Sequence, residues 1–108
     1  MPKSTLGVTV GPVVLKLGGE LIDSSQELAR IADLIARGAV QRPIVVVHGG
    51  GSEIDAELAR TSLDKRTVDG LRITDQATLD VVVGVLAGRV NTRLVAAVIR
   101  AGVPAVGL

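Results

Sequence analysis

The chain has 108 residues, 47% of them hydrophobic, and a formal net charge of +1, with Lys+Arg 12 against Asp+Glu 11. This balance argues against a protein that binds nucleic acid or an acidic membrane surface. Phe, Trp and Tyr are absent, which excludes aromatic platforms for stacking bases. There is no cysteine and only one histidine, which excludes disulfides and the common zinc sites. Composition therefore predicts a single domain with an aliphatic core and no metal site of its own.

The pattern of apolar residues predicts neither a leader peptide nor a membrane span. Residues 1–4 are not followed by the long apolar run of a signal peptide. The longest apolar stretch, residues 81–87, is far shorter than the roughly 20 residues that a membrane span needs. We therefore expect a soluble, cytoplasmic protein with no membrane contact.

The first predicted elements are a strand and a helix. Residues 13–17 form a short aliphatic run that stops at a pair of glycines, which is typical of a buried strand. Ser24 and Glu27 form a Ser-x-x-Glu capping box, and Gly38 is expected to end the helix that follows. The apolar residues of this helix recur at helical spacing: Leu28, Ile31, Leu34 and Ile35.

A second strand is predicted over residues 43–47, which begin with a proline and continue with four aliphatic residues. It runs into His48 and three glycines. Ser52 is then expected to cap another short helix. Residues 64–70 are polar and predict a loop or an irregular hairpin.

A long amphipathic helix is predicted to begin at Thr74 and Asp75, with the acidic residue in its first turn, and to stop at Gly102. Residues 81–83 are also a strand candidate, but the periodicity favours helix. Residues 103–108 are predicted to begin a third strand. Because the chain stops within that pattern, we expect it to be truncated. The apolar residues with helical spacing are Leu79, Val82, Val83, Leu86, Val90, Leu94, Val95 and Val98.

Strands that alternate with helices, each strand a continuous aliphatic run, predict an α/β fold with a parallel sheet covered on both faces. Ligands of such sheets bind beyond the carboxyl ends of the strands. Two glycine clusters lie there, Gly18–Gly19 and Gly49–Gly51. Glycine allows close approach to the backbone, and a following helix N-terminus favours an anion such as phosphate. The alternative is that these glycines only make tight turns, but two clusters at equivalent positions favour a phosphate site.

Two basic residues are candidates for chemistry. Lys16, close to the end of the first strand, could neutralise a transferring phosphoryl group, or could be an edge-strand lysine that reaches solvent. Arg72 could hold a substrate carboxylate with its two-pronged guanidinium, or could pair locally with Asp69 or Asp75. His48 is expected to position the glycine loop without acid–base chemistry. The Walker A and Rossmann glycine patterns are both absent, so any nucleotide must be held in another way.

Three segments carry a resemblance to a known family: residues 14–19 (VLKLGG), 45–51 (VVVHGGG) and 68–75 (VDGLRITD). They resemble the amino acid kinase family, and the third segment is specifically similar to its acetylglutamate kinases. Residues 78–82, 86–91 and 105–108 are similar as well, so the resemblance runs from about Val13 to the end.

The resemblance implies a three-layer α/β/α sandwich with a mainly parallel sheet, of which residues 1–108 form the N-terminal, substrate-binding part. It implies transfer of the γ-phosphoryl group of ATP to the γ-carboxylate of N-acetyl-L-glutamate, with Mg²⁺, in arginine biosynthesis. The rest of the ATP site would lie in a C-terminal half outside these residues, so the 108-residue chain is expected to be inactive alone. Family members commonly form homodimers or higher homo-oligomers, and the helix over residues 75–86 is either such a subunit contact or part of the ordinary core.

By position, the resemblance also implies roles for individual residues. Lys16 would stabilise the transferring phosphoryl group, and the N–H groups of Gly18 and Gly19 would contact the ATP phosphates. The second cluster, Gly49, Gly50 and Gly51, would border the substrate. Arg72 would hold the substrate's α-carboxylate.

Several residues depart from the family pattern. Ser52 and Asp55 stand where Pro and Asn are usual, Glu20 follows the glycine pair where smaller or amide residues are common, and Thr67 occupies an often aromatic position. These departures concern acyl-group specificity more than the fold. Two other functions stay open: a kinase for carrier-linked aminoadipate or glutamate in lysine biosynthesis, and a non-catalytic α/β domain that senses an amino acid.

Overall fold

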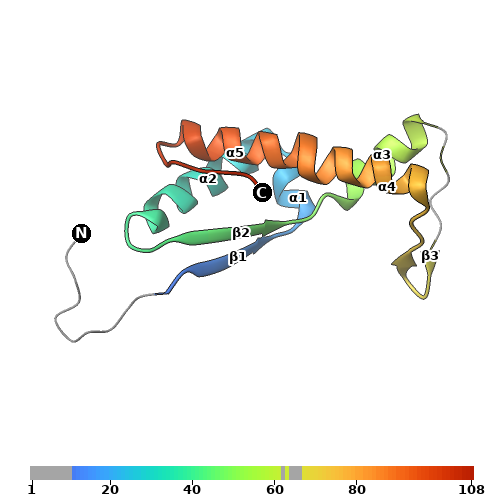
Figure 1. The fold of residues 1–108 in the computed structure, drawn as a ribbon. Helices are drawn as coiled ribbons and strands as arrows, with labels where there is room; N and C mark the ends of the chain where they lie inside the picture. The colour runs from blue at the N-terminus through green and yellow to red at the C-terminus, as the bar shows by residue number, and fades with distance from the viewer. Residues whose placement is uncertain (1–10, 62, 64–66) are drawn as a thin grey trace.

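The structure is a computed structural model that describes residues 11–61, 63 and 67–108. Figure 1 shows helices lying along one side of a two-stranded sheet, with a small hairpin at one end of the molecule. The elements in chain order are β1 (Val13–Leu17), α1 (Gly19–Asp23), α2 (Ser25–Ala39), β2 (Ile44–His48), α3 (Gly51–Arg60), β3 (Thr67–Val68), β4 (Leu71–Arg72), α4 (Gln76–Val83), the π-helical segment η1 (Gly84–Val90) and α5 (Asn91–Arg100).

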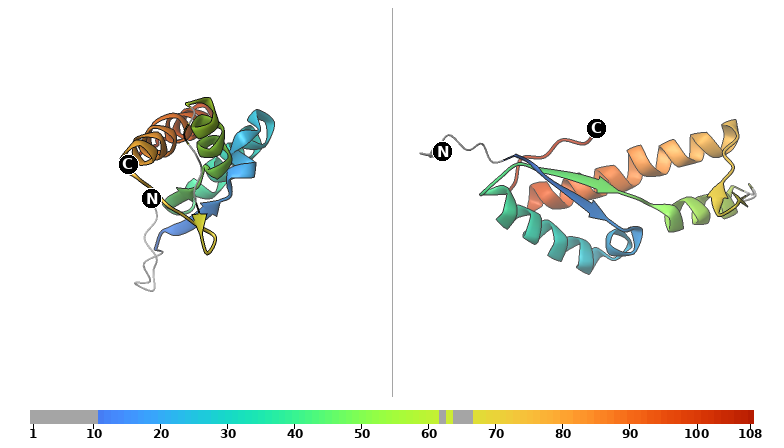
Figure 2. Two further views of the ribbon diagram at one scale, coloured as in Figure 1. Left: turned by 90° about the vertical axis from the view of Figure 1, so that its right-hand side faces the viewer. Right: turned by 90° about the horizontal axis from the view of Figure 1, so that it is seen from below.

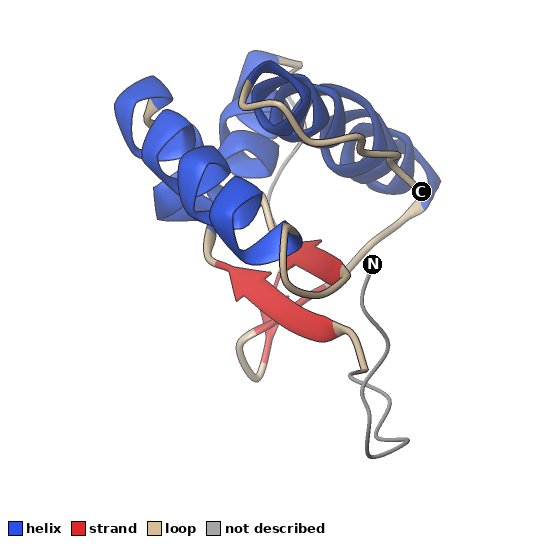
Figure 3. Cartoon of the chain, turned by 90° about the vertical axis from the view of Figure 1, so that its left-hand side faces the viewer, coloured by secondary structure: helices blue, strands red, loops and turns tan. Residues whose placement is uncertain are grey.

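The sheet formed by β1 and β2 is parallel, with Val13 opposite Ile44 at one end and Leu17 opposite His48 at the other. This confirms the predicted α/β class with a parallel sheet. Burial alternates along both strands: Leu17 lies in the core, whereas Val14 is 66% exposed. Figure 3 shows the described helices on one side of this sheet. The strands are therefore covered on one face only, because the described residues supply a single helical layer where two were predicted.

The helix α2 begins as its capping box predicts. The backbone N–H of Glu27 donates to the Ser24 hydroxyl at 3.3 Å. The helix continues one residue beyond Gly38, and Leu34, expected on the buried stripe, is exposed. The core side of the helix consists of Leu28, Ile31, Ala32 and Ile35.

The segments α4, η1 and α5 form one continuous helix from Gln76 to Arg100, as the apolar periodicity predicted. Its N-cap is Asp75, whose carboxylate accepts from the Thr78 backbone N–H at 2.8 Å. A π-helical middle was not predicted. The views in Figures 1 and 2 show this helix running along α2 and α3, which places Val85 and Val90 in the core.

This long helix is apolar enough, by length and composition alone, to cross a membrane. The sequence shows no uninterrupted apolar run long enough for a span, but the whole helix from Gln76 to Arg100 is longer than the roughly 20 residues that a span needs. Core helices of soluble proteins meet the same criterion, and this one packs against α2 on one side and α3 on another. The absence of membrane contact therefore stays a prediction.

The segment after the long helix does not form the predicted third strand. Gly102, with φ of 100°, reverses the chain, and residues 103–108 run back along the helix (Figure 1). The side-chain amide of Asn91 donates to the Leu108 carbonyl at 3.1 Å. Val103 and Ala105 pack on the core, so the segment keeps the alternation of a strand. It pairs with neither β1 nor β2, and without a ladder partner it is not a strand.

The hairpin of β3 and β4, over residues 67–72, agrees with the loop or irregular hairpin predicted for residues 64–70. Residues 64–66, also part of that prediction, lie outside the described residues. Asp69 and Gly70 have φ of 51° and 78°, as a tight turn between antiparallel strands requires. Asp–Gly suits this turn because both residues tolerate positive φ. The turn brings Arg72 back toward α3.

Candidate functional site

The two glycine clusters lie against each other at the carboxyl ends of β1 and β2. A Cβ placed on Gly19 would lie 3.8 Å from the Cα of Gly50 and 3.9 Å from the backbone N of Gly51. The Gly49 N–H donates to the Leu17 carbonyl at 3.4 Å, which continues the strand pairing into the loops. The two clusters therefore meet at one edge of the sheet, as expected for the carboxyl ends of parallel strands.

Each glycine loop leads directly into a helix. Gly18 is the N-cap of α1 and Gly50 is the N-cap of α3, and neither helix start has a side-chain cap. The first N–H groups of these helices are thus not occupied by a capping side chain, and α3 adds the positive end of its dipole. Ser52 was expected to cap α3. Its hydroxyl instead donates to the Asp23 carboxylate, which ties the end of α1 to the start of α3.

Lys16 lies on β1 opposite Val47, on the open face of the sheet. Its side chain is exposed, so it needs no buried partner, contrary to the expectation for a strand buried on both faces. It precedes the first glycine pair by two residues. The position suits a cation that reaches a ligand held at the strand tips, and it equally suits a lysine in solvent.

His48 is the last residue of β2 and lies beside the second glycine cluster. Its Nδ1 is 3.0 Å from the Gly49 carbonyl oxygen, so this nitrogen carries the proton and donates. The contact agrees with a role in positioning the glycine loop. Within residues 11–61, 63 and 67–108, no group of three or more His, Asp or Glu side chains is arranged to hold a metal ion.

Arg72 reaches the site through α3. Its Nη2 donates to the Asp55 carboxylate at 2.7 Å, so its ion-pair partner is the distant Asp55 instead of the predicted local partners Asp69 or Asp75. Asp55 lies four residues after Gly51, about 6 Å along the helix axis. The Nη1 of Arg72 is shielded from solvent and has no hydrogen-bond partner among the described residues. An unsatisfied buried donor of this kind costs about 1–3 kcal/mol, which a bound acceptor would remove.

Lys16 and Arg72 are not in contact. Lys16 belongs to the sheet, whereas Arg72 belongs to the hairpin, which lies beyond the strand tips in both Figure 1 and Figure 2. The two glycine clusters thus contact each other directly, whereas Arg72 contacts Asp55, which lies about one turn of α3 away from them. A groove of about 270 Å³ between α2 and α5, floored by alanines, lies apart from these residues.

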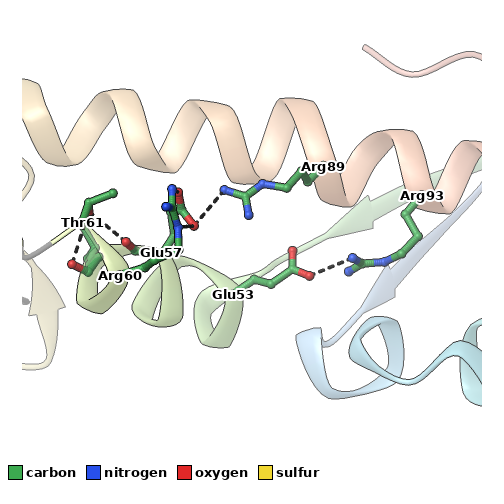
Figure 4. A network of polar contacts seen from close by, with 7 residues as sticks. Glu53, Glu57, Arg60, Thr61, Arg89 and Arg93 are labelled. Atoms are coloured by element: carbon green, nitrogen blue, oxygen red, sulfur yellow. Dashed lines mark hydrogen bonds and ion pairs between the residues drawn. The ribbon is translucent and has the colours of Figure 1, made fainter.

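Two ion pairs fix α3 on the long helix, as Figure 4 shows. Glu53 pairs with Arg93 at 2.7 Å, and Glu57 pairs with Arg89 at 3.2 Å. The acids are one turn apart on α3, and the arginines are one turn apart where η1 passes into α5. Because α3 starts at the second glycine cluster, these pairs also fix the orientation of that loop.

The contacts of Glu57 predict that the stability of the protein changes with pH in the acidic range. A hydrogen bond from Arg60, with a further contribution from Arg89, lowers the pKa of the Glu57 carboxyl from 4.5 to about 2. A carboxyl with a depressed pKa contributes stability that is present above pH 4.5 and is lost as the pH falls toward about 2. We expect Glu57→Gln to destabilise the protein at pH 7 and to flatten the decline of its unfolding free energy between pH 4.5 and 2.

Urea unfolding at a series of pH values measures this difference. Glu27→Gln is the matched control, because the Glu27–Arg30 pair lies in solvent. An unfolding free energy of Glu57→Gln that runs parallel to the wild-type curve through this pH range would contradict the assigned pKa.

Gly50 is required where the glycine loop meets the π-helical segment. A Cβ on this residue would lie 2.9 Å from Leu86 Cδ2 and 3.3 Å from Val90 Cγ2. Its φ of 170° is extended backbone, so the constraint is space and not backbone strain. We expect Gly50→Ala to lower the unfolding free energy by roughly 1–2 kcal/mol through overpacking. Gly51→Ala is the control, since nothing lies within 4 Å of a Cβ there. Equal stability of the two variants, measured by urea unfolding, would refute this reading.

Four contacts of the site were missed from the sequence. Asp55 with Arg72 and Ser52 with Asp23 join residues far apart in the chain, and no local pattern marks them. The pairs of Glu53 and Glu57 with Arg89 and Arg93 do have a signal: two acids and two arginines, each spaced by four residues on predicted helices.

Comparison with known proteins identifies several relatives. The chain is 45% identical over 95 residues to an acetylglutamate kinase of Methanopyrus kandleri. This match covers 88% of the present chain and 35% of the relative. It is 42% identical over 100 residues to an acetylglutamate kinase of Shewanella halifaxensis, covering 89% and 36%. The chain therefore spans about a third of the length of the curated relatives it matches.

Among solved structures, N-acetylglutamate synthase from Neisseria gonorrhoeae, complexed with coenzyme A and N-acetyl-glutamate, superposes with a TM-score of 0.70. It is 26% identical, and the match covers 89% of this chain and 22% of that one. A protein from Streptococcus mutans UA159 gives a TM-score of 0.66 at 26% identity, covering 85% and 37%. The sequence model of the amino acid kinase family matches residues 11–108, a range that contains β1, β2 and both glycine loops. The chain therefore belongs to the amino acid kinase family.

Proposed function

We propose that this chain supplies the substrate-binding part of a kinase that transfers the γ-phosphoryl group of ATP to the γ-carboxylate of N-acetyl-L-glutamate. The observation that carries the proposal is the close contact of the two glycine loops at the strand tips, with two uncapped helix starts beside them. Backbone N–H groups in such a place stabilise the charge that develops in phosphoryl transfer. The similarity to acetylglutamate kinases supports this substrate.

In this proposal each predicted residue keeps its role. Lys16 would neutralise charge on the phosphoryl group, and the N–H groups of Gly18 and Gly19 would bind ATP phosphates. Gly49, Gly50 and Gly51 would line the path between donor and acceptor. The reaction needs no general base, because the acceptor carboxylate is already ionised at neutral pH.

Arg72 would bind the α-carboxylate of the substrate. A guanidinium fork matches the two oxygens of a carboxylate, and the unpartnered Nη1 supports this assignment. Mg²⁺ would supply charge neutralisation for the ATP phosphates.

A coupled ADP-release assay on the complete polypeptide that contains residues 1–108 tests the function. We expect turnover with N-acetyl-L-glutamate and much less with unacylated glutamate or a carrier-linked aminoadipate. Preference for the carrier-linked substrate would favour the lysine-biosynthesis alternative. Amino-acid binding without any ATP-dependent turnover would favour a sensing domain. For residues 1–108 alone we propose weak binding of N-acetyl-L-glutamate without turnover, since they span about a third of the curated relatives.

We also propose that the enzyme acts in arginine biosynthesis, in the cytoplasm, as a homo-oligomer. Leu79 and Val83 support the oligomer, because they are exposed one turn apart on α4 and form an apolar strip that a second copy could cover. Sedimentation of the complete polypeptide measures its assembly, and a monomer at micromolar concentration would remove this part of the proposal.

A further inference from the structure

The hydrogen bond between Asp55 and Arg72 is placed to hold the guanidinium of a ligand-binding arginine in one orientation. Arg72 stands on β4, a strand of two residues, and such a short hairpin gives a long side chain little support of its own. Asp55 comes from α3, a helix fixed to the core by Ile54 and Leu58. The Nη2–Oδ1 hydrogen bond of 2.7 Å therefore ties the arginine of the short hairpin to a helix that is packed on the core.

The contact leaves part of the guanidinium unused. Asp55 accepts from Nη2, whereas Nη1 has no hydrogen-bond partner among the described residues although it is shielded from solvent. The Arg72 side chain as a whole is 21% exposed, although Nη1 itself is shielded from solvent. A small carboxylate that displaced the atoms covering Nη1 would supply the acceptor that this nitrogen lacks.

We propose that Asp55 is a positioning residue, which holds the Arg72 guanidinium in the orientation that binds the carboxylate of an N-acylated acidic amino acid. This inference rests on the proposed function, because it deepens the role given there to Arg72. The acceptor oxygen of Asp55, rather than its charge, does the positioning. The negative charge of the same carboxylate disfavours the incoming substrate carboxylate, so a neutral side chain with the same acceptor oxygen is expected to position Arg72 as well.

Two substitutions separate these effects. Asp55→Asn keeps an oxygen at the Oδ1 position and removes the charge, while Asp55→Ala removes both. Calorimetric titration of the complete polypeptide with N-acetyl-L-glutamate is the measurement. We expect Asp55→Ala to weaken binding about tenfold and Asp55→Asn to weaken it less than about threefold. Asp33→Ala, an exposed aspartate on α2, serves as the control and is expected to bind as the wild type does.

A double-mutant cycle shows whether Asp55 acts through Arg72. The double variant Asp55→Ala/Arg72→Ala is expected to bind no more weakly than Arg72→Ala alone. Losses that add in the double variant would overturn the inference, as would an affinity loss in Asp55→Asn as large as that in Arg72→Ala. The Asp55→Asn variant needs no alanine at position 55. It can therefore still overturn the inference if Asp55→Ala does not fold.

A second readout does not depend on ligand. The NMR signals of the Arg72 guanidinium are expected to be sharp and protected from exchange in the wild type and in Asp55→Asn, and broadened in Asp55→Ala. Wild-type protein that binds no N-acetyl-L-glutamate would refute the proposed substrate and leave this positioning test standing. Wild-type binding that Arg72→Ala weakens and Asp55→Ala does not, with unchanged guanidinium signals, would refute the role of Asp55 alone.

Discussion

Replacing Lys16 with alanine is expected to reduce kcat of the complete polypeptide by about 10²–10³-fold, the usual cost of losing one group that stabilises transition-state charge. The lysine lies two residues before Gly18 on the open face of β1, and we propose that its ammonium reaches a phosphoryl group held at the strand tips. Because its side chain is exposed, the substitution is expected to leave the unfolding temperature unchanged. Steady-state ADP release and thermal unfolding measure the two quantities.

The control for Lys16 is a surface cation away from the strand tips. Arg30→Ala on α2 removes one positive charge whose ion pair, with Glu27, lies in solvent. It is expected to keep wild-type kcat. A Lys16→Ala variant with the activity of Arg30→Ala would show that the lysine is a solvent-facing residue of an open sheet, which is the alternative its position also allows.

Replacing Arg72 with alanine is expected to raise KM for N-acetyl-L-glutamate by roughly 10–100-fold, with a smaller change in kcat. Hydrogen bonds to a charged group contribute about 1.5–3 kcal/mol each, and the lost interaction serves binding of substrate and transition state alike. Arg72→Lys is expected to recover only part of the affinity, since an ammonium lacks the planar fork. KM for ATP is expected to stay the same, because Arg72 lies on the hairpin and not on the glycine loops.

The specificity of the Arg72 effect provides its check. Arg60→Ala, which removes an exposed arginine near the end of α3, is the matched variant and is expected to leave KM for the substrate unchanged. An equal rise of KM for ATP and for N-acetyl-L-glutamate in Arg72→Ala would mean that the variant disturbs the hairpin or α3 as a whole, and the carboxylate-binding role would be wrong.

Much of the fold could be predicted because local rules decide it. The box of Ser24 and Glu27 and the apolar spacing of the long helix each depend on residues within a few turns of one another. The third strand was wrong for a different reason. Residues 103–108 have the right alternation, but a strand exists only through pairing, and none of the described strands pairs with them. The π-helical turns in η1 also left no recognisable mark in the sequence.

The site was predicted in its parts but not in its contacts. The glycine clusters could be found because a short aliphatic strand followed by glycines places both at one sheet edge. The partner of Arg72 could not be found, because Asp55 lies 17 residues away on another element. Similarly, a serine at the start of a helix predicts a cap, and only the fold reveals that Asp23 is close enough for Ser52 to bond there instead. Long-range polar contacts of this kind depend on packing, which local sequence rules do not describe.

The central claim is that the two adjoining glycine loops form one anion-binding place for phosphoryl transfer. Backbone amide NMR shifts in the complete polypeptide, on addition of N-acetyl-L-glutamate and a non-hydrolysable ATP analogue, test it most directly. We expect the largest changes at Gly19, Gly50 and Gly51, with Arg72 affected by the acylated substrate alone. Ligand binding that shifts other amides and leaves these three glycines unchanged would contradict it.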